Sequence, residues 1–334
     1  MAISKNATIS DIAKQANVSV ATVSRIINQT GFVKPETRQK VLDAIRDLNL
    51  SPSDFRIRDR LENTKSILVC LPDFRNPFNA DIIDGIQATA SLRGFRTFFY
   101  EASDINNAIT EYKTIMEQNH FSGLLLLHNV LEQDSLSQLR LKYPIVMCSE
   151  HCNLSNVSFV SIDDVYSSQI AVNYLISTGR TKIALVNSML TNAYAKYRER
   201  GFLDAMTKAG LPPRKDWILH ISNINFDIAT SVISSLLKNP EHPDAFYCVS
   251  DVYGAAAIKA IQNCGLHVPK DIAVIGFDNI DLSKMVAPSL TTINQPKYQI
   301  GQQSCELLLD LITNPSSATQ HILLNTELIV RDST

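Results

Sequence analysis

The sequence lacks the motifs that mark the common classes of nucleotide-binding and hydrolytic enzymes. It holds no G-x-G-x-x-G after an apolar run, no phosphate-binding P-loop and no G-x-S-x-G nucleophile elbow. Its seven histidines do not fall into a spacing typical of a catalytic site. We therefore expect that the chain is not an enzyme and that it has no catalytic residue and no cofactor.

Long apolar segments are missing as well, and cysteines are few. No stretch approaches the roughly 18 unbroken apolar residues of a membrane-spanning helix, and the opening MAISKNATIS has no signal-peptide core. The six cysteines are scattered, several in runs such as ILVCLP and AFYCVS that are typical of reduced, buried thiols. Only the segment CSEHC (148–152) suggests a metal site, and one loop offers too few spaced ligands. These features predict a cytoplasmic protein without a membrane partner or a metal.

A strong net charge is also absent. The chain has 31 Lys and Arg against 33 Asp and Glu, a formal charge of −2, so the whole molecule is not a nonspecific binder of nucleic acid. Residues 1–60 hold ten basic and six acidic side chains, a balance of +4, which leaves −6 for the remainder. A slightly basic head on an acidic body indicates a small DNA-binding module attached to a larger domain.

Residues 8–28, TISDIAKQANVSVATVSRIIN, predict two short helices around a tight turn. Apolar residues recur at helical spacing, Thr8 can cap the first helix and Ser19 the second, and Asn17 can adopt the left-handed conformation that a sharp turn needs. Such a pair is a helix-turn-helix, whose second helix lies in the DNA major groove. An ordinary helical hairpin is the alternative.

A third helix and a linker follow. Pro35 suits the first turn of a helix, and an apolar stripe follows it, formed by Val41, Leu42, Ile45 and Leu48. We therefore expect residues 1–52 to form a three-helix headpiece. Residues 53–65 are charged and have few apolar side chains, so they predict a hinge or linker ahead of a core at 66–334.

From residue 66 onward, short apolar runs alternate with helical segments. Continuous apolar strands alternating with helices are typical of parallel sheets covered on both faces, and this many strands predicts two α/β lobes. The expected strands are 67–73, 96–102, 123–129, 143–150, 158–163, 182–188, 217–221, 245–250, 272–278, one more between 291 and the helix at 299–311, and 324–330. The expected helices are 79–93, 105–119, 165–178, 195–209, 226–237, 252–264 and 299–311.

Polar and aromatic residues gather where these strands end. Ligands bind beyond the carboxyl ends of parallel strands, and carboxylates and amides beside aromatic rings suit a polyhydroxylated ligand that carries a flat ring. The alternative for Asp163 and Asp251 is that each caps the helix that follows it. The strand-end residues are Asp73, Asn76, Phe78, Glu150, Asp163, Ser250, Asp251, Asp278 and Asn279.

Several longer motifs carry a resemblance to a known family. They are TISDIAKQANVSVATVSRIIN, PDFRNPF, YRERGF, VSDVYGAAAI and VIGFDNIDLSKMVAPSLTTINQP, in that order. The chain resembles, over essentially its whole length, the LacI/GalR family of bacterial transcription regulators. The segments GFDNIDL, LTTINQPKYQIG and ELIVRDST are most similar to the cytidine-repressor branch of that family.

The resemblance implies an architecture and an assembly. It implies a helix-turn-helix headpiece and a two-lobed, periplasmic-binding-protein-like core of doubly wound parallel sheets. The first lobe would hold about 66–163 and 292–323 and the second about 164–291 and 324–334, with chain crossings near Asp163, 288–291 and 323–324. It also implies a homodimer whose two headpieces read a near-palindromic DNA operator.

The resemblance places the DNA contacts as well. The base-reading positions are Val20, Ala21 and Arg25, of which Arg25 suits a guanine edge and the other two a thymine methyl. Hydroxyl and amide side chains would hold phosphates, although Thr8 and Ser19 have capping as an alternative or additional role. The phosphate-binding positions are Thr8, Ser19, Thr22, Ser24 and Asn28.

The hinge departs from the family pattern. Leu50, Pro52 and Ser53 stand where members commonly have Tyr, Pro and Asn, and the following Ala-Arg pair is missing. Leu61 occupies the place of a minor-groove leucine wedge when counted back from the core, whereas Asp59 does so when counted forward. We expect a flexible linker whose arginines contact phosphates without sequence preference. These arginines are Arg56, Arg58 and Arg60.

The resemblance finally implies an effector site between the lobes. Arg198 matches the arginine of an R-x-x-G-F motif, and Asp278 matches the carboxylate of G-F-D-N. Phe78 and Phe226 would sandwich the ligand, with core packing as an equal alternative. The remaining wall residues are Asn76, Glu150 and Ser250.

The expected function is an allosteric repressor of transcription that binds double-stranded operator DNA. Its effector would be a nucleoside such as cytidine, with a sugar or a purine as the alternative. The resemblance also implies a second DNA-bound regulator, such as the cyclic AMP receptor protein, beside it. A periplasmic-type solute-binding protein is the less favoured reading, because the chain shows a basic headpiece and no signal peptide.

Overall fold

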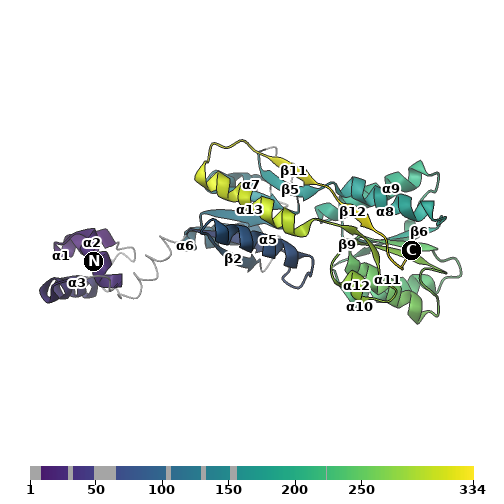
Figure 1. Cartoon of the computed structure of the whole chain (residues 1–334), viewed down its shortest axis with the longest axis horizontal. Helices are drawn as coiled ribbons and strands as arrows, with labels where there is room; N and C mark the ends of the chain where they lie inside the picture. The colour runs from purple at the N-terminus through teal and green to yellow at the C-terminus, as the bar shows by residue number, and fades with distance from the viewer. Residues whose placement is uncertain are drawn as a thin grey trace. The chain divides into compact units, whose positions relative to one another are not determined.

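The computed structural model describes residues 9–28, 33–48, 65–102, 107–128, 133–150, 156–222 and 224–334. The chain divides into two compact units. The smaller unit contains the N-terminal helices, and the larger holds most of the chain from Ile67 to Thr334 (Figure 1). The larger unit is built from two six-stranded sheets, and each sheet with its helices is called a lobe here.

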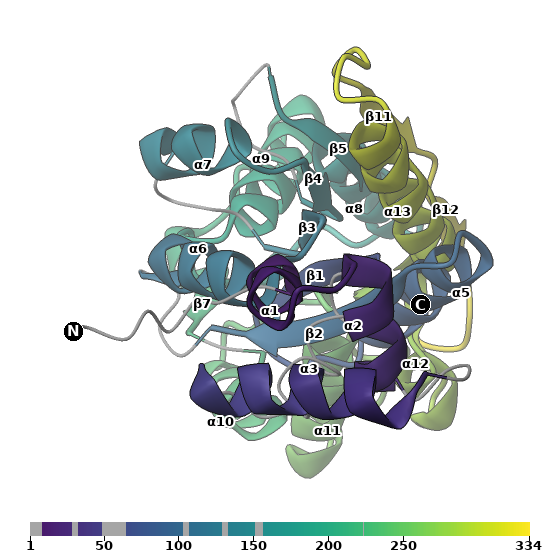
Figure 2. The same ribbon diagram turned by 90° about the vertical axis from the view of Figure 1, so that its left-hand side faces the viewer.

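The headpiece is a bundle of three helices, α1 (Ile9–Ala16), α2 (Val20–Asn28) and α3 (Pro35–Asp47) (Figure 2). Asn17 has a φ of 54°, as the tight turn requires, and the Thr22 amide donates to Ser19 Oγ at 3.2 Å, so Ser19 caps α2. The predicted apolar faces meet in one small core; Ile9 and Leu48 are half buried and pack against it, whereas Leu42 is half buried and is not part of it. This core contains Ile12, Ala13, Ala16, Val23, Ile26, Ile27, Val41, Ala44 and Ile45.

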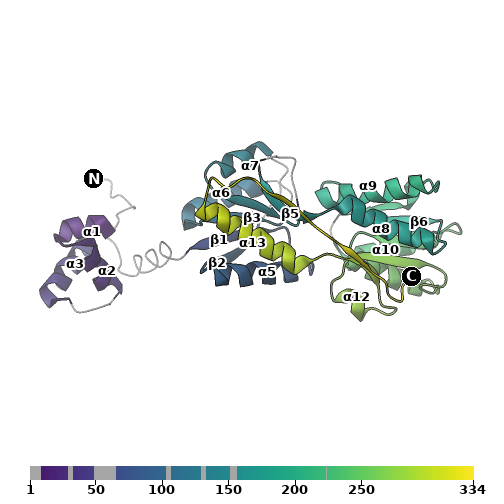
Figure 3. The same ribbon diagram turned by 45° about the horizontal axis from the view of Figure 1, so that its top comes forward.

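The first lobe has a sheet with the strand order β11-β5-β4-β3-β1-β2. Helices α5 and α13 bury their apolar faces on one side of this sheet, and α6 and α7 on the other (Figure 3). The strands are β1 (Ser66–Leu71), β2 (Arg96–Glu101), β3 (Gly123–Leu126), β4 (Ile145–Cys148), β5 (Ser158–Ile162) and β11 (His321–Leu324). The helices are α5 (Asn79–Leu92), α6 (Ala108–Asn119), α7 (Gln133–Arg140) and α13 (Lys297–Thr313).

The second lobe has the strand order β12-β10-β9-β8-β6-β7, parallel except for the antiparallel edge strand β12. The strands are β6 (Ile183–Ser188), β7 (Ile218–Ile221), β8 (Ala245–Cys248), β9 (Ala273–Asp278), β10 (Thr291–Asn294) and β12 (Glu327–Ile329). The helices are α8 (Asp164–Ser177), α9 (Ala193–Lys208), the 3-10 turn η1 (Lys215–Trp217), α10 (Phe226–Leu237), α11 (Asp251–Asn263) and α12 (Leu282–Met285).

The chain passes three times between the lobes, and the second passage differs from the prediction. Strand β10 pairs with β9 from Thr291–Ile275 to Asn294–Asp278, so it belongs to the second lobe. The assignment of residues 292–294 to the first lobe is therefore wrong, and the passage follows Asn294 instead of lying at 288–291. The first passage lies at Asp163, between β5 and α8, as expected.

The third passage lies at residues 325–326, next to the crossing expected near 323–324, and it interrupts the run 324–330 that we predicted as one strand. The segment HILLNTELIV forms β11 in the first sheet and β12 in the second, with residues 325–326 between them (Figure 1). Each sheet thus gains an edge strand from the C-terminal segment. The passages place the carboxyl ends of β5 and β10, and the helix starts of α8 and α13, in segments that join the two lobes.

The lobe cores confirm the parallel α/β architecture. Residues of β1, β3, β4, β6, β8 and β9 are buried along their whole length, as expected for strands covered on both faces. Four described cysteines are buried, whereas Cys264 is exposed, which corrects the expectation that the thiols are core residues. Among the helices in the described ranges, none is long and apolar enough to cross a membrane.

Candidate functional site

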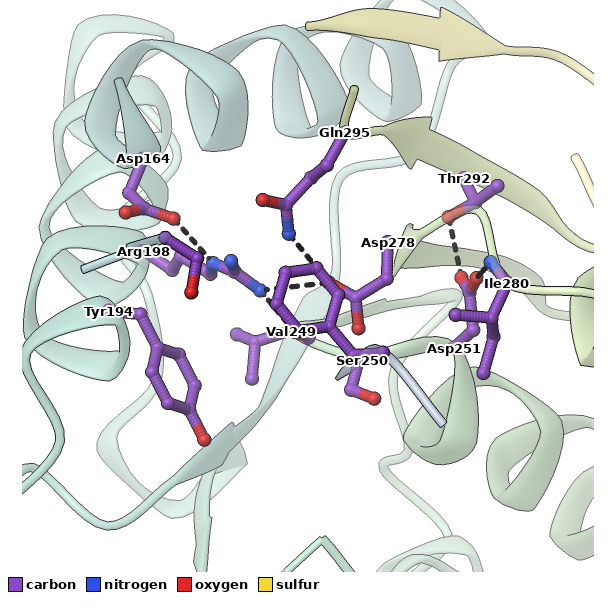
Figure 4. A network of polar contacts seen from close by, with 12 residues as sticks. Asp164, Tyr194, Arg198, Val249, Ser250, Asp251, Asp278, Ile280, Thr292 and Gln295 are labelled. Atoms are coloured by element: carbon purple, nitrogen blue, oxygen red, sulfur yellow. Dashed lines mark hydrogen bonds and ion pairs between the residues drawn. The ribbon is translucent and has the colours of Figure 1, made fainter. Parts of the chain in front are cut away.

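Arg198, on α9, is the centre of a buried charge cluster (Figure 4). Its side chain is 7% exposed; Nε donates to Asp164 Oδ1 at 2.7 Å, and Nη1 donates to the Val249 carbonyl at 2.7 Å. Nη1 also lies 3.5 Å from Asp278 Oδ1, and the guanidinium carbon lies 3.7 Å from the centre of the Phe277 ring. A buried guanidinium of this kind needs anionic partners. The prediction named Arg198 and Asp278 but missed Asp164.

Asp278 ends strand β9, in a conformation that few residues other than glycine adopt. Its φ is 108°, and that of Asn279 is 51°. The carboxylate accepts from Gln295 Nε2 at 2.8 Å, and the main-chain carbonyl accepts from Lys297 Nζ at 2.8 Å. Burial raises the pKa of the Asp278 carboxyl, and the charge of Arg198 opposes that rise. The carboxylate is therefore held in place by both an amide and a guanidinium.

Glu150 lies just beyond β4 and is 8% exposed. Within the described parts of the chain, its carboxyl has neither a hydrogen bond nor an ion pair. Burial raises its pKa to about 8, the charge of Asp164 raises it further, and Arg198 lowers it. A nine-tenths buried carboxyl with no partner among the described residues is costly for folding, and buried groups with shifted pKa values are enriched at functional sites.

This pKa predicts a pH dependence of stability. Between about pH 5 and pH 8 the folded chain keeps the Glu150 proton that the unfolded chain releases, so the free energy of unfolding falls as pH rises. The contribution approaches about 1.4 kcal/mol per pH unit. Urea unfolding of the wild type and Glu150→Gln across this range measures it. We expect the wild type to lose stability relative to the variant, and parallel profiles would show that Glu150 titrates normally.

The remaining strand-end residues have mixed roles. Ser250 is buried and caps α11, its Oγ accepting from the Val252 amide at 3.2 Å. Asp163 caps α8, as the alternative predicted. Asp251 does not cap α11: its carboxylate accepts from Thr292 Oγ1 at 2.5 Å and from the Ile280 amide at 2.8 Å. Asp251 thus links the start of α11 to β10 and to the segment after β9. The expectation that Asp251 caps α11 is wrong.

The predicted aromatic walls differ in exposure. Phe78 is half buried and packs against the core, while Asn76 Oδ1 accepts from the Phe78 amide at 3.1 Å in a local turn. Phe226, the first residue of α10, is 39% exposed. Phe226 is therefore accessible enough to contact a ligand, whereas Phe78 packs against the core, as its alternative predicted.

Phenolic hydroxyls extend the polar region that surrounds Arg198. Tyr194 lies over the guanidinium at 5.1 Å and donates to Ser188 Oγ at 2.9 Å, and Ser188 is also bonded to the Tyr253 hydroxyl at 3.2 Å. The sequence interpretation missed all three. Ser188 is the last residue of strand β6. Ligands bind beyond the carboxyl ends of parallel strands, and this principle, which singled out Ser250 and Asp278, applies equally to Ser188.

A cavity of about 620 Å³ adjoins this cluster. Asn279, Gln295 and Lys297, which contact Asp278, line one part of it, and Pro77 and Asp81 of the first lobe line another. Arg198 and Glu150 are not among its lining residues.

On the headpiece, α2 divides into a buried and an exposed face. Val20, Ala21 and Arg25 are exposed, opposite the buried core positions. The Ser19 and Thr22 hydroxyls are bonded to each other at 2.8 Å, and Ser24 is half buried. The other predicted DNA contacts, Thr8, Arg56, Leu61 and the Asn28 side chain, lie outside the described residues, as do Arg58 and Arg60.

Comparison with known proteins identifies the family. Residues 8–53 match the model of bacterial regulatory proteins of the lacI family, and residues 172–334 match a periplasmic binding protein-like domain. The transcriptional repressor PurR of Aliivibrio salmonicida is 31% identical over 98% of each chain, and CytR of Escherichia coli K12 is 32% identical over 98% of this chain and 96% of that one. A structure of the transcriptional regulator CelR with cellobiose is 27% identical, covers 98% of this chain and 100% of that one, and has a TM-score of 0.74. These relatives are regulators, which confirms that the chain is not an enzyme. The chain belongs to the LacI family of DNA-binding transcriptional repressors.

Proposed function

We propose that this repressor is a homodimer whose affinity for operator DNA depends on a small molecule bound between its lobes. The observation that carries the proposal is the buried cluster of Asp164, Arg198, Asp278 and Glu150, which brings residues near the ends of β4 and β9 together with the start of α8, the helix that follows the first passage between the lobes. Two carboxylates contact one guanidinium, and the nearby Glu150 carboxyl, whose pKa the Arg198 charge lowers, has no partner among the described residues. Hydrophobic residues would stabilise a core better, so the cluster is better explained by ligand binding.

The ligand class that fits best is a nucleoside such as cytidine. Asp278 and Arg198 offer an acceptor and donors for ribose hydroxyls, and the exposed ring of Phe226 offers a face for a base. The carboxyl of Glu150, protonated near neutral pH, offers one donor and one acceptor, which an amino-substituted ring can match. The resemblance to the cytidine-repressor branch supports the same class. A purine or a sugar is the second candidate, and the likeness to a regulator in complex with cellobiose favours the sugar.

Calorimetric titration of the full chain with cytidine, adenosine, ribose and hexoses tests the ligand class. We expect the wild type to give heat of binding with cytidine. The affinity for cytidine should fall at least tenfold in Asp278→Asn, because a hydrogen bond from a ligand hydroxyl to a charged carboxylate is lost. Asp281→Asn, an exposed carboxylate nearby in sequence, is the matched control and should bind as the wild type does. Heat with a hexose alone would contradict the nucleoside assignment.

At the DNA end, we expect α2 of each headpiece to read one half of a near-palindromic operator. Arg25 would supply the hydrogen-bonding contact to a base, with Val20 and Ala21 giving apolar contacts. The likeness of the headpiece to the family model supports these positions. The cytoplasmic location and the second DNA-bound regulator stay predictions.

A further inference from the structure

Lys297, the first residue of α13, holds together groups from both lobes. Its side chain is 5% exposed, and Nζ donates to the carbonyls of Asp278 at 2.8 Å and Asn279 at 3.1 Å, both in the second lobe. The same ammonium lies 3.4 Å from Asp81 Oδ2, on α5 of the first lobe. An ammonium has three protons, and three acceptors surround this one.

The two carbonyls that accept from Lys297 belong to residues with an uncommon, left-handed backbone conformation. Asp278 and Asn279 both have positive φ, 108° and 51°, although neither is glycine. Such conformations persist only where surrounding groups enforce them. The Lys297 contacts therefore help to fix the direction in which Asp278 presents its carboxylate.

The backbone of Lys297 belongs to α13, which packs closely against α5. A Cβ placed on Gly301 of α13 would lie 2.1 Å from the Ile82 carbonyl, and one on Gly85 would lie 2.2 Å from the Tyr298 carbonyl. The backbones of α13 and α5 thus touch, and only glycine fits at these contacts. Asp81 is one turn before Gly85, so α5, α13 and the Lys297 stem belong to one packed unit of the first lobe.

We propose that Lys297 is a positioning residue that couples the ligand-binding carboxylate of Asp278 to helix α5 through Asp81. The proposal rests on the proposed function, because it supplies the route by which a ligand held by Asp278 would act on the first lobe. Asp81 is 58% exposed, so its ion pair with Lys297 is weak and can be exchanged for water. A ligand that shifts Asp278 moves the carbonyls that hold the ammonium, and this changes the contact with α5.

Hydrogen exchange of the full chain, without ligand or DNA, tests the coupling directly. Asp81→Asn changes only the first lobe, yet it should speed exchange of the Asn279 and Ile280 amides in the second lobe about threefold, and Lys297→Met should speed it about tenfold. The matched controls are Asp84→Asn and Lys284→Met. Asp84 is an exposed acid on α5, and Lys284, like Lys297, lines the cavity of about 620 Å³. Both should leave these amides within about twofold of the wild type.

The outcomes separate this proposal from the ligand assignment. Unchanged exchange at Asn279 and Ile280 in both Asp81→Asn and Lys297→Met overturns the coupling, whatever the ligand is. Should the Lys297 variant fold poorly, Asp81→Asn alone decides, because its carboxylate is largely exposed. In a second arm, cytidine is titrated into wild type and Asp81→Asn. Altered exchange together with no cytidine binding to the wild type supports the coupling and contradicts the nucleoside effector.

Discussion

Replacing Arg198 with methionine is expected to lower the free energy of unfolding by about 3–5 kcal/mol and to abolish effector binding. The substitution keeps much of the side-chain volume but leaves the Asp164 and Asp278 carboxylates buried without their guanidinium partner. It also removes the donor to the Val249 carbonyl. The loss is expected to exceed that of a surface pair several times over, because the charges cannot regain water.

Urea unfolding at neutral pH measures the effect on stability. Arg200→Met is the matched control, since Arg200 lies on the same helix and pairs with Asp204 at 3.7 Å on the exposed surface. We expect the control to change the free energy of unfolding by less than about 0.5 kcal/mol. If Arg198→Met and Arg200→Met changed the free energy of unfolding equally, the claim that Arg198 holds a buried charge cluster together would be contradicted.

Replacing Arg25 with alanine is expected to remove most of the sequence preference of the headpiece. Among the three predicted base-reading positions, Arg25 alone can form hydrogen bonds, and it is exposed on α2. A bidentate pair with guanine discriminates against other bases by about 1–3 kcal/mol, and a dimer contains two such contacts. Selection from random DNA followed by titration at fixed salt measures the change.

The matched control for Arg25 is Arg46→Ala, on the exposed surface of α3. It removes the same charge from the headpiece, so it reports the nonspecific electrostatic contribution. We expect Arg46→Ala to retain the selected sequence and Arg25→Ala to bind many sequences with similar affinity. An unchanged preference in Arg25→Ala would show that the recognition helix is assigned wrongly.

The sequence predicts the parts of this fold that local interactions decide. The turn at Asn17, the cap at Ser19 and the start of α3 at Pro35 each depend on residues within a few positions of one another. The buried strands are equally visible, because a strand covered on both faces is apolar throughout. The extent of β10 and the division of HILLNTELIV between two sheets depend on pairing partners distant in sequence, and no local pattern encodes those.

In the candidate site, too, local sequence predicts some residues, whereas others are recognised only from the folded chain. Strand ends and motifs pointed to Arg198, Asp278 and Glu150, but Asp164, Gln295 and Lys297 become neighbours of these residues only in the folded chain. One signal was present: two adjacent acids, Asp163 and Asp164, follow a buried strand, and only one of them can cap the next helix. The other is then free to face a buried cation.

The central claim is that a ligand held by the interlobe cluster controls DNA binding. Titration of labelled, selected operator with the full chain, with and without saturating cytidine, tests it for the wild type and Asp278→Asn. We expect cytidine to change the wild-type Kd for operator by about 5–150-fold, the range of typical allosteric couplings, and to leave that of Asp278→Asn unchanged. Without cytidine the two proteins should bind operator equally. The same cytidine response in both proteins, or a response in neither, would contradict the account.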